Sequence, residues 1–121
     1  MFDGDDLDAA ERRVDEWETG LSERAAAARE LATRLADLSV SAKSSDGLVT
    51  VRVNASGMAG LELAEGIRQR PATETAEAIM ATLRKAQGAL TVAATRVTEE
   101  TVGAESETGK AVIAAYRVRH G

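Results

Sequence analysis

The sequence predicts an α+β fold that consists of a long helix, a three-stranded antiparallel β-meander and a second long helix. Three observations predict it. Apolar residues recur at alternating spacings of three and four in the first third of the chain and again after the middle, as they do along one helix face. Between these regions, apolar and polar residues alternate, which is typical of strands with one buried face. Turn residues divide this alternating region into three short strands.

The first helix is expected over about residues 6–36. Gly20 lies inside the helical pattern and costs about 1 kcal/mol relative to alanine, so we expect either a continuous helix that is weak at this point or a helix whose start frays. Arg24 interrupts the apolar heptad pattern at a d-type position. The apolar positions are Leu7, Ala10, Val14, Trp17, Leu21, Ala28, Leu31, Leu35 and Leu38.

The segment Ser44–Leu63 is the most informative part of the chain. Asp46-Gly47 is a strong hairpin signal because glycine accepts positive φ without steric cost. A second turn is expected at residues 54–57, where the sequence reads Asn-Ala-Ser-Gly. The residues expected on the buried face of the three strands are Val40 and Ala42, then Val49, Val51, Val53 and Ala55, then Ala59, Leu61 and Leu63.

The second helix is expected over about residues 73–102, with Thr73 as its N-cap after Pro71. Its heptad positions are Ala76, Ile79, Leu83, Ala86, Leu90, Ala93 and Val97. Residues 1–103 are therefore expected to form one domain. The tail, residues 104–121, starts polar and becomes apolar and basic, and the sequence allows either a short helix or disorder.

The composition indicates an oligomer. Hydrophobic residues make up 44% of the chain, but the aromatic residues are only Phe2, Trp17 and Tyr116. The remaining apolar side chains are mostly Ala, Val and Leu, and each of them buries little surface. Because burial stabilises by roughly 25 cal/mol per Å² of apolar surface, each contributes little to the core. Two long helices and three short strands would leave much of this surface exposed in a monomer, so we expect a two-fold homodimer.

The charge is concentrated at the N-terminus. The net charge is −5. Residues 1–20 hold eight acids against Arg12 and Arg13, so the other residues sum to +1. Overall acidity argues mildly against nucleic-acid binding, and its confinement to one segment weakens that objection. The acidic start and the lack of a membrane-spanning apolar run lead us to expect a cytoplasmic protein without a membrane partner.

The residues of catalytic chemistry are scarce, and we do not expect an enzyme, a metal site or a cofactor. The chain has no cysteine, and its one histidine is His120 near the C-terminus. Residues 103–110 read GAESETGK, which is close to a phosphate-binding loop. That motif needs a following Ser or Thr and a preceding strand, and both are missing here.

The basic residues of the helices and of the polar sheet face are the candidate functional residues. One interpretation treats them as ordinary surface charges, some in helical pairs such as Glu30–Arg34 and Asp8–Arg12. The alternative is collective: doubled in a dimer, they would contact the phosphates of duplex DNA with little sequence information. The candidate DNA-binding residues are Arg24, Arg29, Arg34, Lys43, Arg52, Arg84, Lys85 and Arg96.

Three features make the sequence similar to the YbaB/EbfC family of small bacterial nucleoid-associated proteins. They are the segment SSDGLVTVRVNASGMAGLELAEG at Ser44–Gly66, the order helix–meander–helix, and the segment TETAEAIMATLRKAQ at Thr73–Gln87. The resemblance covers roughly residues 7–102. The acidic start and the basic C-terminal extension depart from the family pattern. The Ala- and Arg-rich, Lys-poor composition favours an actinobacterial source.

The resemblance implies a homodimer formed largely through the sheets, with helices that project like tweezers and bind duplex DNA at the nucleoid. It also implies an alternative. Actinobacteria have YbaB-like proteins associated with type VII secretion, and such a protein would act as a scaffold or chaperone for a protein partner without binding DNA. The acidic N-terminus keeps this alternative open.

Overall fold

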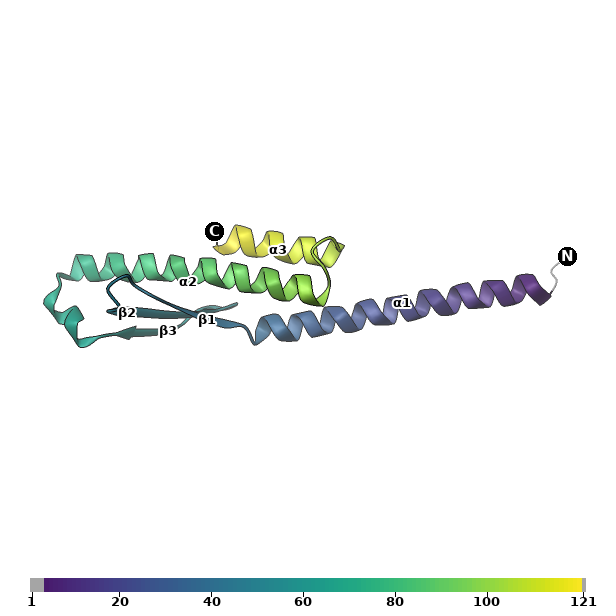
Figure 1. The fold of residues 1–121 in the computed structure, drawn as a ribbon, viewed down its shortest axis with the longest axis horizontal. Coiled ribbons are helices and arrows are strands. Elements are labelled where there is room, and N and C mark those ends of the chain that lie inside the picture. Colours follow the sequence, from purple (N-terminus) through teal and green to yellow (C-terminus); the bar gives the residue numbers. More distant parts are fainter. Residues whose placement is uncertain (1–3, 121) are drawn as a thin grey trace.

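A computed structural model of the chain describes residues 4–120 and confirms the α+β fold (Figure 1). The elements follow in the expected order, with a short 3₁₀ helix, Glu65–Gln69, between the sheet and the second long helix. The tail forms a third helix. The elements are α1 (Gly4–Ala36), β1 (Ser39–Lys43), β2 (Val49–Asn54), β3 (Gly57–Leu63), α2 (Ala72–Thr101) and α3 (Glu107–His120).

The three strands form one antiparallel sheet in the order β1-β2-β3, and both turns lie where the sequence predicts them. Gly47 has a φ of +76° and Gly57 a φ of +122°, values that residues other than glycine rarely adopt. In the second turn the amide of Ser56 donates to Oδ1 of Asn54 over 2.9 Å, which closes an Asx turn.

A β-bulge in β3 changes the predicted set of buried-face residues. Arg52 pairs with Gly60, but the next residue of β2, Val53, pairs with Met58, which leaves Ala59 as the extra residue. Met58 therefore shares a face with Leu61 and Leu63, and the prediction for Ala59 was wrong. Leu61 and Leu63 lie on the predicted face but are 41% and 44% exposed, so the prediction that they are buried was also wrong. The alternation predicted for β3 could not anticipate the bulge, because it depends on pairing with β2.

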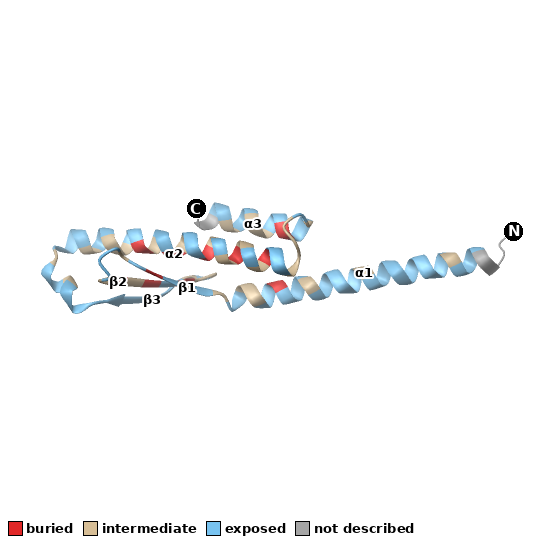
Figure 2. Cartoon of the chain, in the orientation of Figure 1, coloured by how far each residue is buried: buried red, intermediate tan, exposed pale blue. Residues whose placement is uncertain are grey.

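The core lies between one face of the sheet and α2 (Figure 2). Val49, Val51 and Val53 of the central strand are at most 1% exposed, and Ala86 and Leu90 of α2 are fully buried against them. The buried residues of α2 repeat every four residues and differ in part from the predicted heptad. They are Thr82, Ala86, Leu90, Ala94 and Thr98.

Two threonines occupy buried positions of α2 that the apolar pattern did not include. The hydroxyl of Thr82 donates to the carbonyl of Ala78, and that of Thr98 to the carbonyl of Ala94, each over 2.7 Å. These bonds satisfy the hydroxyl groups within the helix, so a threonine can face the core there. The heptad prediction counted only apolar residues and therefore missed them.

The start of α2 also differs from the prediction. The helix begins at Ala72, and the position before it is Pro71, with no side-chain cap. Thr73 therefore lies inside the first turn, and its prediction as the N-cap was wrong. Pro71 has a φ of −58°, close to the helical value, and its carbonyl accepts a bond from the amide of Thr75. The helix accordingly starts directly after the proline.

The helices are arranged around α2. The sheet covers one side of α2, and α3 packs along another, while the N-terminal part of α1 projects away from the rest of the molecule (Figure 1). The C-terminal part of α1 is joined to the end of α2 by Arg34. Its guanidinium donates to Thr101 over 2.8 Å and lies 2.9 Å from Glu100.

The segment that resembled a phosphate loop forms the tight turn between α2 and α3. Gly103 ends α2 with a φ of +83°, and its amide donates to the carbonyl of Thr98. Ser106 caps α3: its hydroxyl accepts from the amide of Gly109 and donates to the carbonyl of Gly103, each over 2.9 Å. Both glycines thus serve the turn.

Candidate nucleic-acid interface

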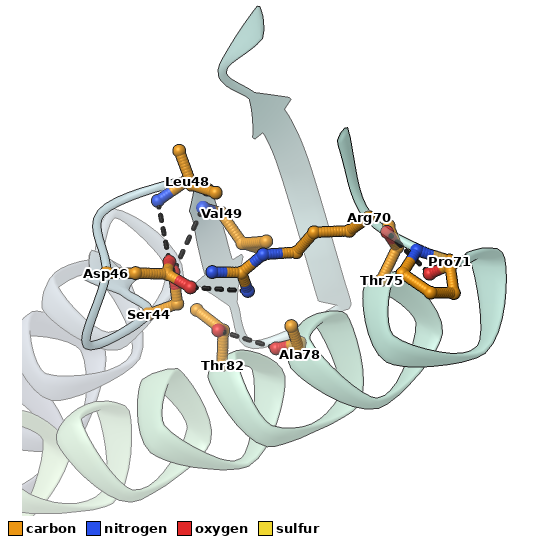
Figure 3. A network of polar contacts seen from close by, with 9 residues as sticks. All are labelled: Ser44, Asp46, Leu48, Val49, Arg70, Pro71, Thr75, Ala78 and Thr82. Carbon is orange, nitrogen blue, oxygen red and sulfur yellow. Dashed lines mark hydrogen bonds and ion pairs between the residues drawn. The ribbon is translucent and has the colours of Figure 1, made fainter. Parts of the chain in front are cut away.

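A network of polar contacts organises the β1–β2 turn and connects it to the start of α2 (Figure 3). Oδ1 of Asp46 accepts from the amide of Leu48 over 2.9 Å and from the hydroxyl of Ser44 over 2.7 Å. Oδ2 of Asp46 lies 2.5 Å from the guanidinium of Arg70. The amide of Leu48, then the hydroxyl of Ser44 and Arg70, lower the pKa of Asp46 to about 2, so this carboxylate is ionised at neutral pH.

The side chain of Lys85 meets the backbone of Lys43 beside this turn, although the two residues lie on different elements. The ammonium of Lys85 donates to the carbonyl of Lys43 over 2.9 Å. Both lysines line a surface hollow of about 350 Å³, together with Arg70 and Asp46. We call Lys43, Asp46, Arg70 and Lys85 the turn cluster. Arg70 and Lys85 exceed its one carboxylate by a single positive charge, so a phosphate group would be attracted here. Lys43 contributes its backbone carbonyl, because its side chain alternates with that of the buried Ala42 and lies on the other face of the sheet.

The middle of α2 is a cationic surface. From Ala78 to Thr98 the helix carries Arg84, Lys85 and Arg96 and no acidic residue. All three cations are exposed. Arg96 lines a second shallow hollow with Glu99 of α2 and with Arg117 of α3, which sequence analysis did not select. The phosphate backbone of a nucleic acid would therefore meet positive charge along several turns of α2.

Arg52 lies on the sheet face that points away from α2. Its guanidinium donates to the carbonyl of Ala59 over 3.2 Å and crosses the strand above Gly60. A Cβ atom at Gly60 would lie 3.2 Å from Nε of Arg52, so the absence of a side chain there makes room for the arginine. Gly60 thus allows the Arg52 guanidinium to lie over β3 on this face of the sheet.

The remaining candidates lie on α1. Arg24 and Arg29 are exposed, and Arg24 lines a hollow of about 600 Å³ between α1 and the α2–α3 turn. Arg34 is bound to Glu100 of α2, so its predicted pairing with Glu30 was wrong. Arg12 donates from Nε to the backbone carbonyl of Asp8, which differs from the predicted pair of side chains. Helix spacing alone could not show that α2 offers Arg34 a better-placed carboxylate.

The predicted residues therefore fall into separate groups. The structure binds the Lys85 side chain to the backbone of Lys43 and sets Arg84 and Arg96 on α2, while Arg52 and the arginines of α1 lie elsewhere. Sequence analysis missed Arg70 and Arg117 as members of these groups. The sequence does hold one signal for Arg70. It precedes Pro71, and a residue before a proline is restricted to an extended backbone, which limits where its side chain can point. The place of Arg117 beside Arg96 depends on how α3 packs on α2, so no local sequence pattern indicates it.

The arrangement agrees with the result of comparing the chain with known protein families. The sequence model of the YbaB/EbfC DNA-binding family matches residues 20–105, which include the whole sheet and the whole of α2. The chain belongs to this family. The resemblance seen in the sequence is thus confirmed, and membership of the YbaB/EbfC family supports a nucleoid-associated, DNA-binding role. Comparisons with curated proteins and with solved structures found no match.

The boundaries of the family match separate two parts of this YbaB/EbfC protein. Most of the acidic segment, residues 1–19, and the whole of α3 lie outside the match. The turn cluster and the cationic stretch of α2 lie inside it. Within residues 4–120, no three His, Cys, Asp or Glu side chains are grouped to hold a metal ion. No helix in that part of the chain is both long and apolar enough to cross a membrane.

Proposed function

We propose that this YbaB/EbfC protein is a cytoplasmic, nucleoid-associated protein that binds duplex DNA through the phosphate backbone as a homodimer. The observation that carries the proposal is the stretch of α2 from Ala78 to Thr98, which has three exposed cations and no acidic residue. This stretch lies inside the family match. The turn cluster extends this positive surface to the sheet. Phosphate contacts of this kind position a duplex without reading its sequence.

The apolar side of β3 supports the homodimer. Met58, Leu61 and Leu63 face the same side of the sheet as the buried valines of β2, yet they are 49%, 41% and 44% exposed. The core cluster joins α2 to β1 and β2 and includes no residue of β3. β3 is also an edge strand of the sheet, with unpaired backbone groups on one side. A second copy placed against β3 would cover both features.

The experiment that tests DNA binding is fluorescence anisotropy of a labelled random duplex, titrated with the full-length protein at several salt concentrations. The affinity is expected to fall log-linearly with salt, with a slope of roughly −0.9 per neutralised phosphate. The double variant Arg84→Glu/Arg96→Glu is expected to weaken binding and to flatten the slope. Failure of the wild type to bind at low salt would refute the DNA-binding proposal.

A matched control separates a local effect from a change in net charge. Arg12→Glu/Arg13→Glu changes the net charge by the same amount, but on the acidic part of α1. This control is expected to change the affinity far less than the α2 variant. Equal losses in both variants would mean that α2 is not the contact surface.

A protein scaffold linked to type VII secretion, without DNA binding, is the second candidate function. The observation that favours it is the exposed apolar row on the N-terminal part of α1, of which Leu7, Val14 and Trp17 lie outside the family match. Co-purification with one specific protein, combined with no DNA affinity at physiological salt, would support this candidate over the first.

A further inference from the structure

The projecting part of α1 carries an apolar stripe that nothing in the described structure covers. The stripe follows the a and d positions of a heptad, and each of its large residues is exposed. Figure 2 shows that the projecting part of α1 is exposed over most of its length. Its large members are Leu7 (54%), Val14 (53%), Trp17 (63%) and Leu21 (41%). A soluble helix that exposes a tryptophan and three aliphatic side chains in one row is typical of an interaction surface.

The width and length of the stripe indicate the shape of its occupant. Only the a and d positions are apolar, and such a narrow row is the seam into which one other helix packs. From Leu7 to Leu21 the stripe spans about 21 Å at ~1.5 Å per residue. At its C-terminal end, Gly20 and Arg24 flank Leu21 and line the hollow of about 600 Å³ beside the α2–α3 turn. The end of a docked helix would have room there.

The charges beside the stripe indicate the chemistry of that helix. One border is a row of carboxylates at spacings of three and four, which places them on one side of the helix: Asp8, Glu11, Asp15 and Glu18. Residues 6–23 contain seven acids and two arginines. A helix with lysines or arginines along its own border would complement this row.

We propose that the stripe formed by Leu7, Val14, Trp17 and Leu21 is the docking site for a basic amphipathic helix of a partner protein. The same charges disfavour other occupants. A second copy would set this acidic segment against itself, and duplex DNA or an anionic membrane would meet carboxylates of its own sign. The site is distinct from the cationic surface of α2, so it does not depend on the proposed DNA binding.

Two synthetic peptides test the proposal. Both have three heptads with Leu at a and d; one has Lys at e and g, and the other has Glu. The full-length protein is titrated against each labelled peptide by anisotropy, and the emission of Trp17, the only tryptophan, is followed at the same time. The Lys peptide is expected to bind roughly tenfold or more tightly than the Glu peptide and to shift Trp17 emission to the blue.

Variants of exposed residues identify the surface. Val14→Gln/Leu21→Gln is expected to abolish binding of the Lys peptide, whereas Thr19→Gln, on the opposite side of α1, is expected to leave it unchanged. Asp15→Lys/Glu18→Lys is expected to favour the Glu peptide. These sites are exposed, so none of the changes removes a core contact.

Several results would overturn the proposal. They include binding of neither peptide, equal binding of both, or the same blue shift with duplex DNA or anionic vesicles. If Val14→Gln/Leu21→Gln lowers the association state of the protein alone in sedimentation, the occupant is a second copy, and the proposal is also overturned.

Discussion

Arg70, the residue before Pro71, is bound to Asp46 of the β1–β2 turn, 24 positions earlier in the chain, with a separation of 2.5 Å between Nη1 and Oδ2 (Figure 3). The contact ties the entrance of α2 to the first hairpin. It also presents the turn beside Lys43 and Lys85. The position of the turn cluster therefore depends on an ion pair between two loops.

The pH dependence of stability should report this ion pair. The pKa of Asp46 is lowered to about 2 in the folded protein from an ordinary value near 3.8. Its contribution is therefore fully present above about pH 4 and is lost as the pH falls from about 4 to 2. Urea unfolding between pH 6 and 2 should show a smaller loss of stability for Asp46→Asn than for the wild type over this interval.

The asparagine variant keeps an oxygen for the amide of Leu48 and suits the Gly47 turn, so it should fold. Parallel pH profiles for the two proteins below pH 4 would mean that Asp46 is not the group that titrates in this window.

Truncation of Leu90 should be the most damaging single change in the core. Leu90 has no exposed surface and packs between α2 and the sheet. Leu90→Ala is expected to lower the free energy of unfolding by roughly 2–5 kcal/mol. Val92→Ala, at a residue of the same helix that is 61% exposed, should change it by about 0.5 kcal/mol or less. Chemical denaturation measures both, and equal losses would contradict the position of the core.

Gly109 should tolerate no side chain. A Cβ atom there would contact the carbonyl oxygen of Gly103, and would also lie 2.9 Å from the hydroxyl of Ser106. Because a backbone atom blocks the space, Gly109→Ala must move the α2–α3 turn and loosen α3. Hydrogen exchange should show faster exchange in α3 than in the wild type.

Gly88 is the matched control for this glycine. It lies inside α2 with nothing within 4 Å of an added Cβ atom. Gly88→Ala should therefore stabilise the protein by up to about 1 kcal/mol, since alanine is the better helix former. If Gly109→Ala instead behaves like Gly88→Ala, the tight turn is not present in solution.

The association state should depend on the apolar side of β3. Leu61→Lys is expected to weaken the proposed homodimer by about tenfold or more, because a charge would be buried at its interface. Glu62→Lys, the neighbouring residue on the other face, should leave the dimer intact. Sedimentation equilibrium measures both; a wild type that stays monomeric, or a variant that dimerises equally well, would contradict an interface at β3.

Much of the fold was predictable because its signals are local. The glycines of the two turns and the alternating valines of β2 set the hairpins before any tertiary contact is considered. The heptad patterns likewise predicted both long helices. Of the candidate site, the cationic middle of α2 could be read from the sequence, because it needs only one helix and the absence of nearby acids.

The sequence by itself determined the type and order of the main elements, the positions of the turns and the separation of an acidic start from a more basic remainder. Only the tertiary structure decided that Thr82 and Thr98 are buried, that Arg34 binds Glu100 and that Arg70 reaches Asp46. It also decided that α2 leaves Leu61 of β3 exposed. The physical reason is that local patterns fix backbone periodicity, whereas these contacts depend on how a helix lies across a sheet and on which distant side chains then meet.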